Sequence, residues 1–285
     1  MKNTLLNISA KIDDSLVKIY ELIVEVAHNN QIKFFVIGAT ARDMVFEYGH
    51  DIKAPRATRD IDLAVQVATW AEFQNLKNAL IATGQFSSSK MEQRLFYQND
   101  TPLDIVPFGA IAGDDTCISW PPDGSVKMNI TGFADAYQAT QTVRLRENPE
   151  LDIQIVTIPA LVILKLMAWR DRPEQSKDAT DLAFLLRNYL DAGQTERLAQ
   201  QHGDLLAEDD FDFERAGARL LGRDIASFVS AATKQKLQQI LSTETGEQKI
   251  YRLVEAMTHR ENGQTFANNL ALLNALYLGI NELTH

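Results

Sequence analysis

The chain has 285 residues, of which 45% are apolar and 23% charged, and its formal net charge is −10. This composition is typical of a globular protein with one or two domains. The negative charge argues against an extended DNA- or RNA-binding surface. The single cysteine, Cys117, excludes an intramolecular disulfide and a thiolate zinc site. The run ALVILKLMAW is too short to span a bilayer and contains a lysine, so we do not expect it to cross a membrane. Because a single cysteine also fits a reducing compartment, we expect a cytoplasmic protein.

Strand and helix patterns alternate over the first 160 residues. In chain order they predict a helix over 13–30, a buried strand over 32–38, a helix over 39–48, a strand over 58–66 and a helix over 70–84. Two strands joined by a tight Asn99-Asp100 turn follow, then a loop over 109–125 and a hairpin over 141–158. These elements predict a mixed sheet flanked by helices.

From Pro159 onward the pattern is almost entirely helical, and proline suits the first turn of a helix. The expected fold class is therefore α+β, with an all-α C-terminal region. We expect one domain over 1–160 and a helical domain over 161–285.

The predicted strand TRDIDLAV carries two carboxylates one residue apart. Side chains alternate faces along a strand, so Asp60 and Asp62 point one way while Ile61, Leu63 and Val65 point toward the core. Two neighbouring negative charges are costly unless solvent, hydrogen bonds or a cation compensate them. An exposed edge strand with solvated carboxylates is the alternative, and the apolar opposite face argues against it.

A third carboxylate, Asp104, lies in PLDIVPF on an expected neighbouring strand. Three carboxylates at one edge of a sheet form an all-oxygen site that suits Mg²⁺ or Mn²⁺. Two such ions about 3.5–4 Å apart form the clamp used for in-line displacement at phosphorus. The alternative for Asp104 is a surface aspartate close to the hairpin turn.

Two further segments bear on phosphate binding. Gly38 and Ala39 stand where a strand turns into a helix, and the backbone amides of a helix N-terminus suit a phosphate. An ordinary turn glycine is the alternative for Gly38. Arg59, with Lys53 and Arg56, belongs either to a solvated charged loop or to a guide for a phosphate chain.

The ordered set of VIGATARD, RDIDLAV and a later lone aspartate resembles the nucleotidyltransferases of the DNA polymerase β superfamily. The downstream PALVILKLMAWRDRPEQSKDATDL is similar to the AbiE-type abortive-infection toxins of type IV toxin–antitoxin systems, and the resemblance covers about residues 30–190. It implies a polymerase-β-like sheet and a metal-dependent transfer of a nucleoside monophosphate from an NTP to an acceptor hydroxyl, with release of pyrophosphate. It also points to an antitoxin protein as a partner.

The resemblance implies roles for individual residues. Asp60 and Asp62 would hold both metals, and Asp104 would complete one metal site and help to activate the acceptor hydroxyl. Gly38 and Ala39 would let backbone amides approach the triphosphate. The family usually has serine or glycine where this chain has Ala39, and Thr40 is the hydroxyl available to replace a serine.

Lys165 would contact phosphate or acceptor, and Asp178 or Asp181 would position that lysine or the substrate. The alternative is that Lys165 reaches solvent or pairs with an aspartate, and that Asp178 belongs to an ion-pair patch with Arg172 and Lys177.

The acceptor stays open between an RNA, such as a tRNA 3′ end, and a small hydroxylated molecule of the aminoglycoside type. A third interpretation is a non-catalytic nucleotide-binding or interaction module. Ala39 favours that module, and the three aspartates oppose it.

Overall fold

The computed structural model describes residues 5–56, 58–113, 116–207, 209–245, 250–258 and 265–282. The chain divides into two compact units, Met1–Thr157 and Ile158–His285. The boundary expected after residue 160 falls inside a helix that begins at Ile158. No helix within the described ranges is long and apolar enough to cross a membrane.

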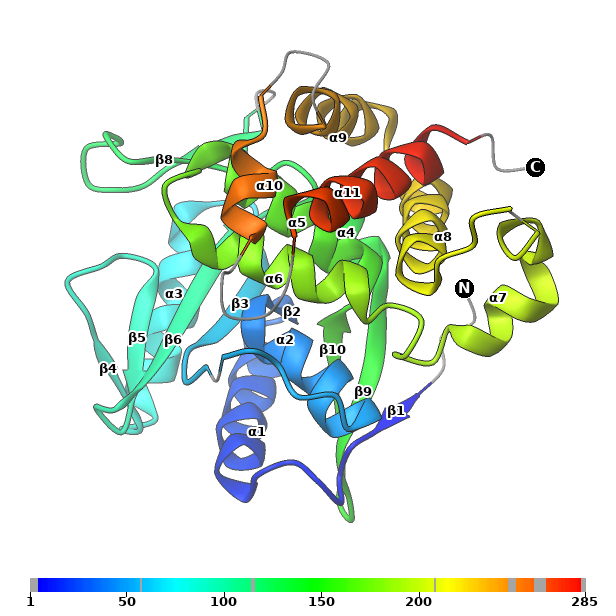
Figure 1. The fold of residues 1–285 in the computed structure, drawn as a ribbon. Helices are drawn as coiled ribbons and strands as arrows, with labels where there is room; N and C mark the ends of the chain where they lie inside the picture. Colours follow the sequence, from blue (N-terminus) through cyan, green and yellow to red (C-terminus); the bar gives the residue numbers. More distant parts are fainter. Residues whose placement is uncertain are drawn as a thin grey trace. The chain divides into compact units, whose positions relative to one another are not determined.

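The first unit is built on a mixed sheet, whose strands can be followed in Figure 1. They are β1 (Leu6–Asn7), β2 (Lys33–Ile37), β3 (Ile61–Gln66), β4 (Phe86–Ser88), β5 (Arg94–Tyr97), β6 (Thr101–Phe108), β9 (Thr140–Glu147) and β10 (Glu150–Val156). Their order across the sheet is β1-β9-β10-β2-β3-β6-β5-β4 in the described part of the chain. A separate pair, β7 (Cys117–Ser119) and β8 (Lys127–Asn129), begins inside the segment expected to be a loop.

Strand β3 lies in the interior of this sheet. It pairs with β2 in antiparallel and with β6 in parallel orientation. Its residues Ile61, Leu63 and Val65 are at most 1% exposed, so the predicted core face is confirmed and the edge-strand alternative is excluded. The strand is shorter than expected, because it begins at Ile61 rather than at residue 58, and Asp60 therefore lies directly before it.

Helices flank the sheet within this unit. They are α1 (Asp14–Asn29), α2 (Gly38–Asp43), the π-helix η1 (Met44–Gly49), α3 (Trp70–Ala82) and α4 (Phe133–Gln138). The side chains of Asp13 and Thr69 cap α1 and α3 by accepting hydrogen bonds from the backbone, as these residue types do at helix N-termini. The segment expected to form one helix over 39–48 is thus a short α-helix, α2, that continues as the π-helix η1.

The described residues of the second unit form helices joined by turns and loops, without a strand, which confirms the expected all-α region. Its helices are α5 (Ile158–Asp171), α6 (Ser176–Arg187), α7 (Thr195–Gln201), the 3₁₀ turn η2 (Gly203–Leu205), α8 (Phe213–Phe228), α9 (Ala231–Glu244), α10 (Arg252–Met257) and α11 (Phe266–Asn281). Helices α8 and α11 lie side by side (Figure 1) and their backbones approach closely, because a Cβ on Gly279 would lie 2.1 Å from the Arg219 carbonyl oxygen. The α+β fold class is confirmed.

Candidate functional site

A row of polar residues crosses the first unit's sheet where β3 begins. Asp62 on β3 is the register partner of Asp104 on β6, and Asp104 is in turn the partner of Arg94 on β5. Side chains at the same level of neighbouring strands point to the same face of a sheet. Strand pairing therefore brings two of the three predicted carboxylates together and adds an arginine.

The turn from β2 into α2 presses against Asp62. Gly38 has a φ of +70°, and a Cβ added there would lie 2.2 Å from Oδ2 of Asp62. Glycine is required at this position both for the left-handed backbone and for the space that the carboxylate occupies. Gly38 therefore sets where the Asp62 side chain lies.

Arg94 binds Asp104 through two parallel hydrogen bonds. Its Nε and Nη2 atoms each lie 2.7 Å from one carboxylate oxygen, and Nη2 lies 3.7 Å from Oδ2 of Asp60. The hydrogen bond to Asp104 raises the pKa of Arg94, and the charges of Asp104, Asp60 and Asp62 add to that rise. One guanidinium thus binds Asp104 and approaches Asp60.

Asp60 is held through its backbone. The hydroxyl of Thr40 donates a hydrogen bond of 2.7 Å to the Asp60 carbonyl, while the Asp60 side chain stays 47% exposed. Thr40 itself is buried, so in this structure its hydroxyl fixes the entry to β3. Arg59, next to Asp60 in the chain, is exposed to solvent.

The side chain of Arg42 holds the loop that precedes Asp60. Arg42 is 1% exposed, donates a hydrogen bond to the Arg56 carbonyl and forms an ion pair of 2.7 Å with Asp43. These contacts give Arg42 and Asp43 a structural role, and they hold the loop at Arg56.

Tyr20 lies in the core on the α1 side of the sheet. Its hydroxyl is fully buried and has no hydrogen-bond partner within the described ranges. Burial raises the pKa of Tyr20 well above its ordinary value, and the negative charge of Asp62 raises it further. The field of Asp62 therefore extends into the core as well as toward solvent.

These donors fit a divalent cation. Asp60, Asp62 and Asp104 offer only oxygen, the donor type that Mg²⁺ and Mn²⁺ prefer, and two of them, Asp104 and Asp60, already lie close to a positive charge, that of Arg94. As they stand, however, no three acidic, histidine or cysteine side chains in the described part of the chain are close enough to share one ion. Arg94 occupies both oxygens of Asp104, so the assignment of all three aspartates to the metal stays a prediction.

The second unit contains the other predicted site residues. The Nζ atom of Lys165 lies 2.9 Å from Asp178 and 2.6 Å from Asp181, and both aspartates are almost completely buried. Arg172 approaches Asp178 at 3.4 Å. The structure thus joins Lys165 to both aspartates, as the ion-pair alternative requires, and their role toward substrate stays a prediction.

A Lys165→Met variant should be strongly destabilised. It removes the lysine that pairs with two buried carboxylates, so we expect the free energy of unfolding to fall by about 3–5 kcal/mol in urea denaturation. Lys77→Met is the matched control, because Lys77 is equally buried but pairs with the half-exposed Glu92; its loss should be about 1 kcal/mol. Equal losses in the two variants would contradict a buried cluster at Lys165.

Comparison with known families decides the classification. Residues 22–245 match the model of the family described as the nucleotidyl transferase AbiEii toxin of type IV TA systems. The chain belongs to this family. The AbiEii match extends beyond the segment that carries the resemblance, and it confirms that resemblance.

One solved structure is also similar to the chain. It is the solution structure of the antibiotic-resistance factor ANT(2'')-Ia, with a TM-score of 0.36 and 14% sequence identity over 69% of this chain and 95% of that chain. No curated protein sequence matches at a significant level.

Within this AbiEii protein, Arg94 is the site residue that the sequence did not single out. Its signal was present in the predicted hairpin. Counting back three residues from Tyr97 and forward three from Thr101, which pair beside the turn, leads to Arg94 and Asp104.

Proposed function

We propose that this AbiEii protein transfers a nucleoside monophosphate from an NTP to an acceptor hydroxyl and releases pyrophosphate. The observation that supports this most is the in-register pair Asp62 and Asp104, with Gly38 packed against the first of them, in a chain of a nucleotidyl transferase family. In the reaction, the hydroxyl oxygen forms a bond to the α-phosphorus while the bond to the bridging oxygen breaks. The cytoplasm supplies NTPs and is the proposed site of action.

Three aspartates would bind the metal, and one of them would also accept a proton. The carboxylates of Asp60, Asp62 and Asp104 would hold Mg²⁺ or Mn²⁺. Bound there, the metal would supply positive charge to the triphosphate and lower the pKa of the acceptor hydroxyl. Asp104 would also take up the hydroxyl proton and pass it to water.

Groups that lie near these aspartates would bind the triphosphate. The backbone amides of Gly38 and Ala39 would face phosphate oxygens, and the exposed Arg59 would contact the phosphate chain. Thr40 would act through the Asp60 backbone that its hydroxyl holds. Lys165, positioned by Asp181, is assigned to phosphate or acceptor. Little covalent work is needed, because positioning and charge provide most of the rate.

For the acceptor we favour an RNA, which is what the resemblance of the sequence to the type IV toxins implies. The description of the family as a toxin of type IV TA systems supports an antitoxin as the counteracting partner. A small hydroxylated molecule and a nucleotide-binding protein without turnover are the competing outcomes of the test.

Label transfer tests the proposal. Purified protein with Mg²⁺ and each α-³²P NTP in turn is incubated with total cellular RNA or, separately, with a small-molecule extract. We expect label on RNA with the wild type and none with the Asp60→Ala/Asp62→Ala double variant. Label on a small molecule instead would overturn the RNA acceptor. Nucleotide binding without any transfer would overturn the enzyme and favour the binding module.

A further inference from the structure

Arg94 is placed beside the predicted metal-binding carboxylates. It is the first residue of β5, directly opposite Asp104, and its guanidinium takes both Asp104 oxygens at 2.7 Å. Its Nη2 atom is also 3.7 Å from Asp60. Both side chains of the pair are mostly buried, at 24% and 19% exposure, so solvent screens their attraction only in part.

The backbone directly before Arg94 is held by two hydrogen bonds. The buried Lys77 donates one to the Glu92 carbonyl, and the Ile105 amide donates one of 2.7 Å to the Gln93 carbonyl. These contacts fix the start of β5, so we expect the guanidinium to leave Asp104 by rotation of its own side chain.

Two cations on one carboxylate repel each other. A divalent ion that uses Asp104 would have to share with Arg94 the oxygens that now accept the two hydrogen bonds of its guanidinium. We propose that Arg94 compensates the three carboxylates in the metal-free protein, competes with the divalent cation for Asp104, and releases Asp104 when the metal binds. This inference rests on the proposed function, and it assigns Arg94 as a positioning residue of that site.

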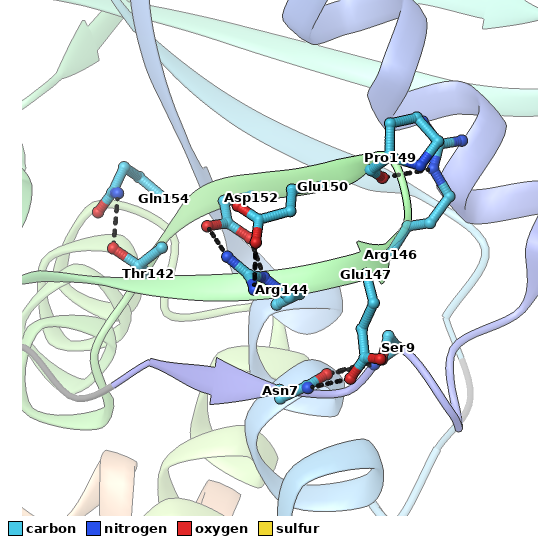
Figure 2. Close-up of polar contacts among 10 residues, drawn as sticks. All are labelled: Asn7, Ser9, Thr142, Arg144, Arg146, Glu147, Pro149, Glu150, Asp152 and Gln154. Atoms are coloured by element: carbon cyan, nitrogen blue, oxygen red, sulfur yellow. Dashed lines mark hydrogen bonds and ion pairs between the residues drawn. The ribbon is translucent and has the colours of Figure 1, made fainter.

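Another strand pair of the same sheet offers a matched control. Arg144 on β9 faces its register partner Asp152 on β10 with two hydrogen bonds of 2.8 and 3.0 Å, and it also pairs with Glu150 at 2.9 Å. Figure 2 shows this arginine between its two carboxylates. Arg144 thus repeats the two-pronged contact that Arg94 makes with the aspartate opposite it in an antiparallel strand pair, but outside the candidate site.

Binding of Mn²⁺ to the full-length protein, measured by isothermal titration calorimetry without nucleotide, tests the competition. We expect Arg94→Gln to bind Mn²⁺ about tenfold more tightly than the wild type, since a hydrogen-bonded charge no longer has to be displaced. Arg144→Gln, which removes the same charge, should leave the affinity unchanged. Arg94→Lys keeps the charge but loses the two-pronged contact, so its affinity should fall between the wild type and Arg94→Gln.

The Asp104→Asn background shows whether the effect passes through Asp104. There, Arg94→Gln should no longer tighten Mn²⁺ binding. Unchanged or weaker binding in Arg94→Gln and Arg94→Lys overturns the proposal, as does equal tightening in Arg144→Gln. Label transfer by the wild type is scored separately: transfer with unchanged Mn²⁺ affinity in the Arg94 variants defeats the counter-ion and leaves the proposed function standing.

Discussion

Asp62→Asn and Asp60→Asn variants should each transfer label at least about 10³-fold more slowly than the wild type, because each removes a charged ligand on which the proposed metal depends. The free energy of unfolding should stay within about 1 kcal/mol of the wild type or rise, since removing one of several neighbouring negative charges relieves repulsion. Transfer is measured with the α-³²P NTP that the wild type uses, and stability by urea denaturation.

Asp152→Asn is the control for this pair of variants. Asp152 is also held by an arginine on a neighbouring strand of the same sheet, and its side chain is 34% exposed. Its loss should leave transfer unchanged. Full transfer by Asp60→Asn or Asp62→Asn would refute the proposed metal site, whereas equal losses in all three variants would indicate a general effect of charge on the sheet.

Gly38→Ala should damage both stability and transfer. At a φ of +70° an alanine is strained by about 1–2 kcal/mol, and its Cβ would overlap the Asp62 carboxylate, 2.2 Å away. We expect the free energy of unfolding to fall by about 2–3 kcal/mol. Transfer should fall about 10²-fold, because displacement of a catalytic group by about 1 Å has an effect of that order.

Gly84→Ala separates backbone strain from the overlap with Asp62. Gly84 has a φ of +72°, almost that of Gly38, but nothing lies within 4 Å of a Cβ built on it. Its unfolding free energy should fall only by the strain of about 1–2 kcal/mol, and its transfer should match the wild type. If Gly38→Ala transfers label as well as Gly84→Ala does, Gly38 does not position the Asp62 side chain.

The long elements of the fold were predictable because hydrophobic periodicity is a local property. Helices α1, α3 and α5 and strands β2, β6, β9 and β10 all lie where the sequence pattern expects them. Several short elements, β1, β4, β7 and α4, were not predicted, since so few residues carry too little periodic signal. The π-helical continuation of α2 was missed because a π-turn leaves no distinct pattern of apolar residues.

The candidate site divides in the same way. The sequence by itself determined that Asp62 and Asp104 stand on strands and that Gly38 ends a strand at a turn. It also determined that these residues follow one another along the chain in the order that resembles the nucleotidyltransferases. The partners of these side chains depend on strand order and register. These non-local pairings, not any local pattern, oppose Arg94 to Asp104 and put Asp62 against Gly38.

For Lys165 the sequence left site and ion pair open, because an isolated helix pattern does not say which acids a lysine meets. Packing within the second unit decided that Asp178 and Asp181 are both buried against it. The sequence specifies the type and spacing of the side chains. Which opposite charge compensates a buried charge is decided only by the tertiary structure, which removes both charges from water.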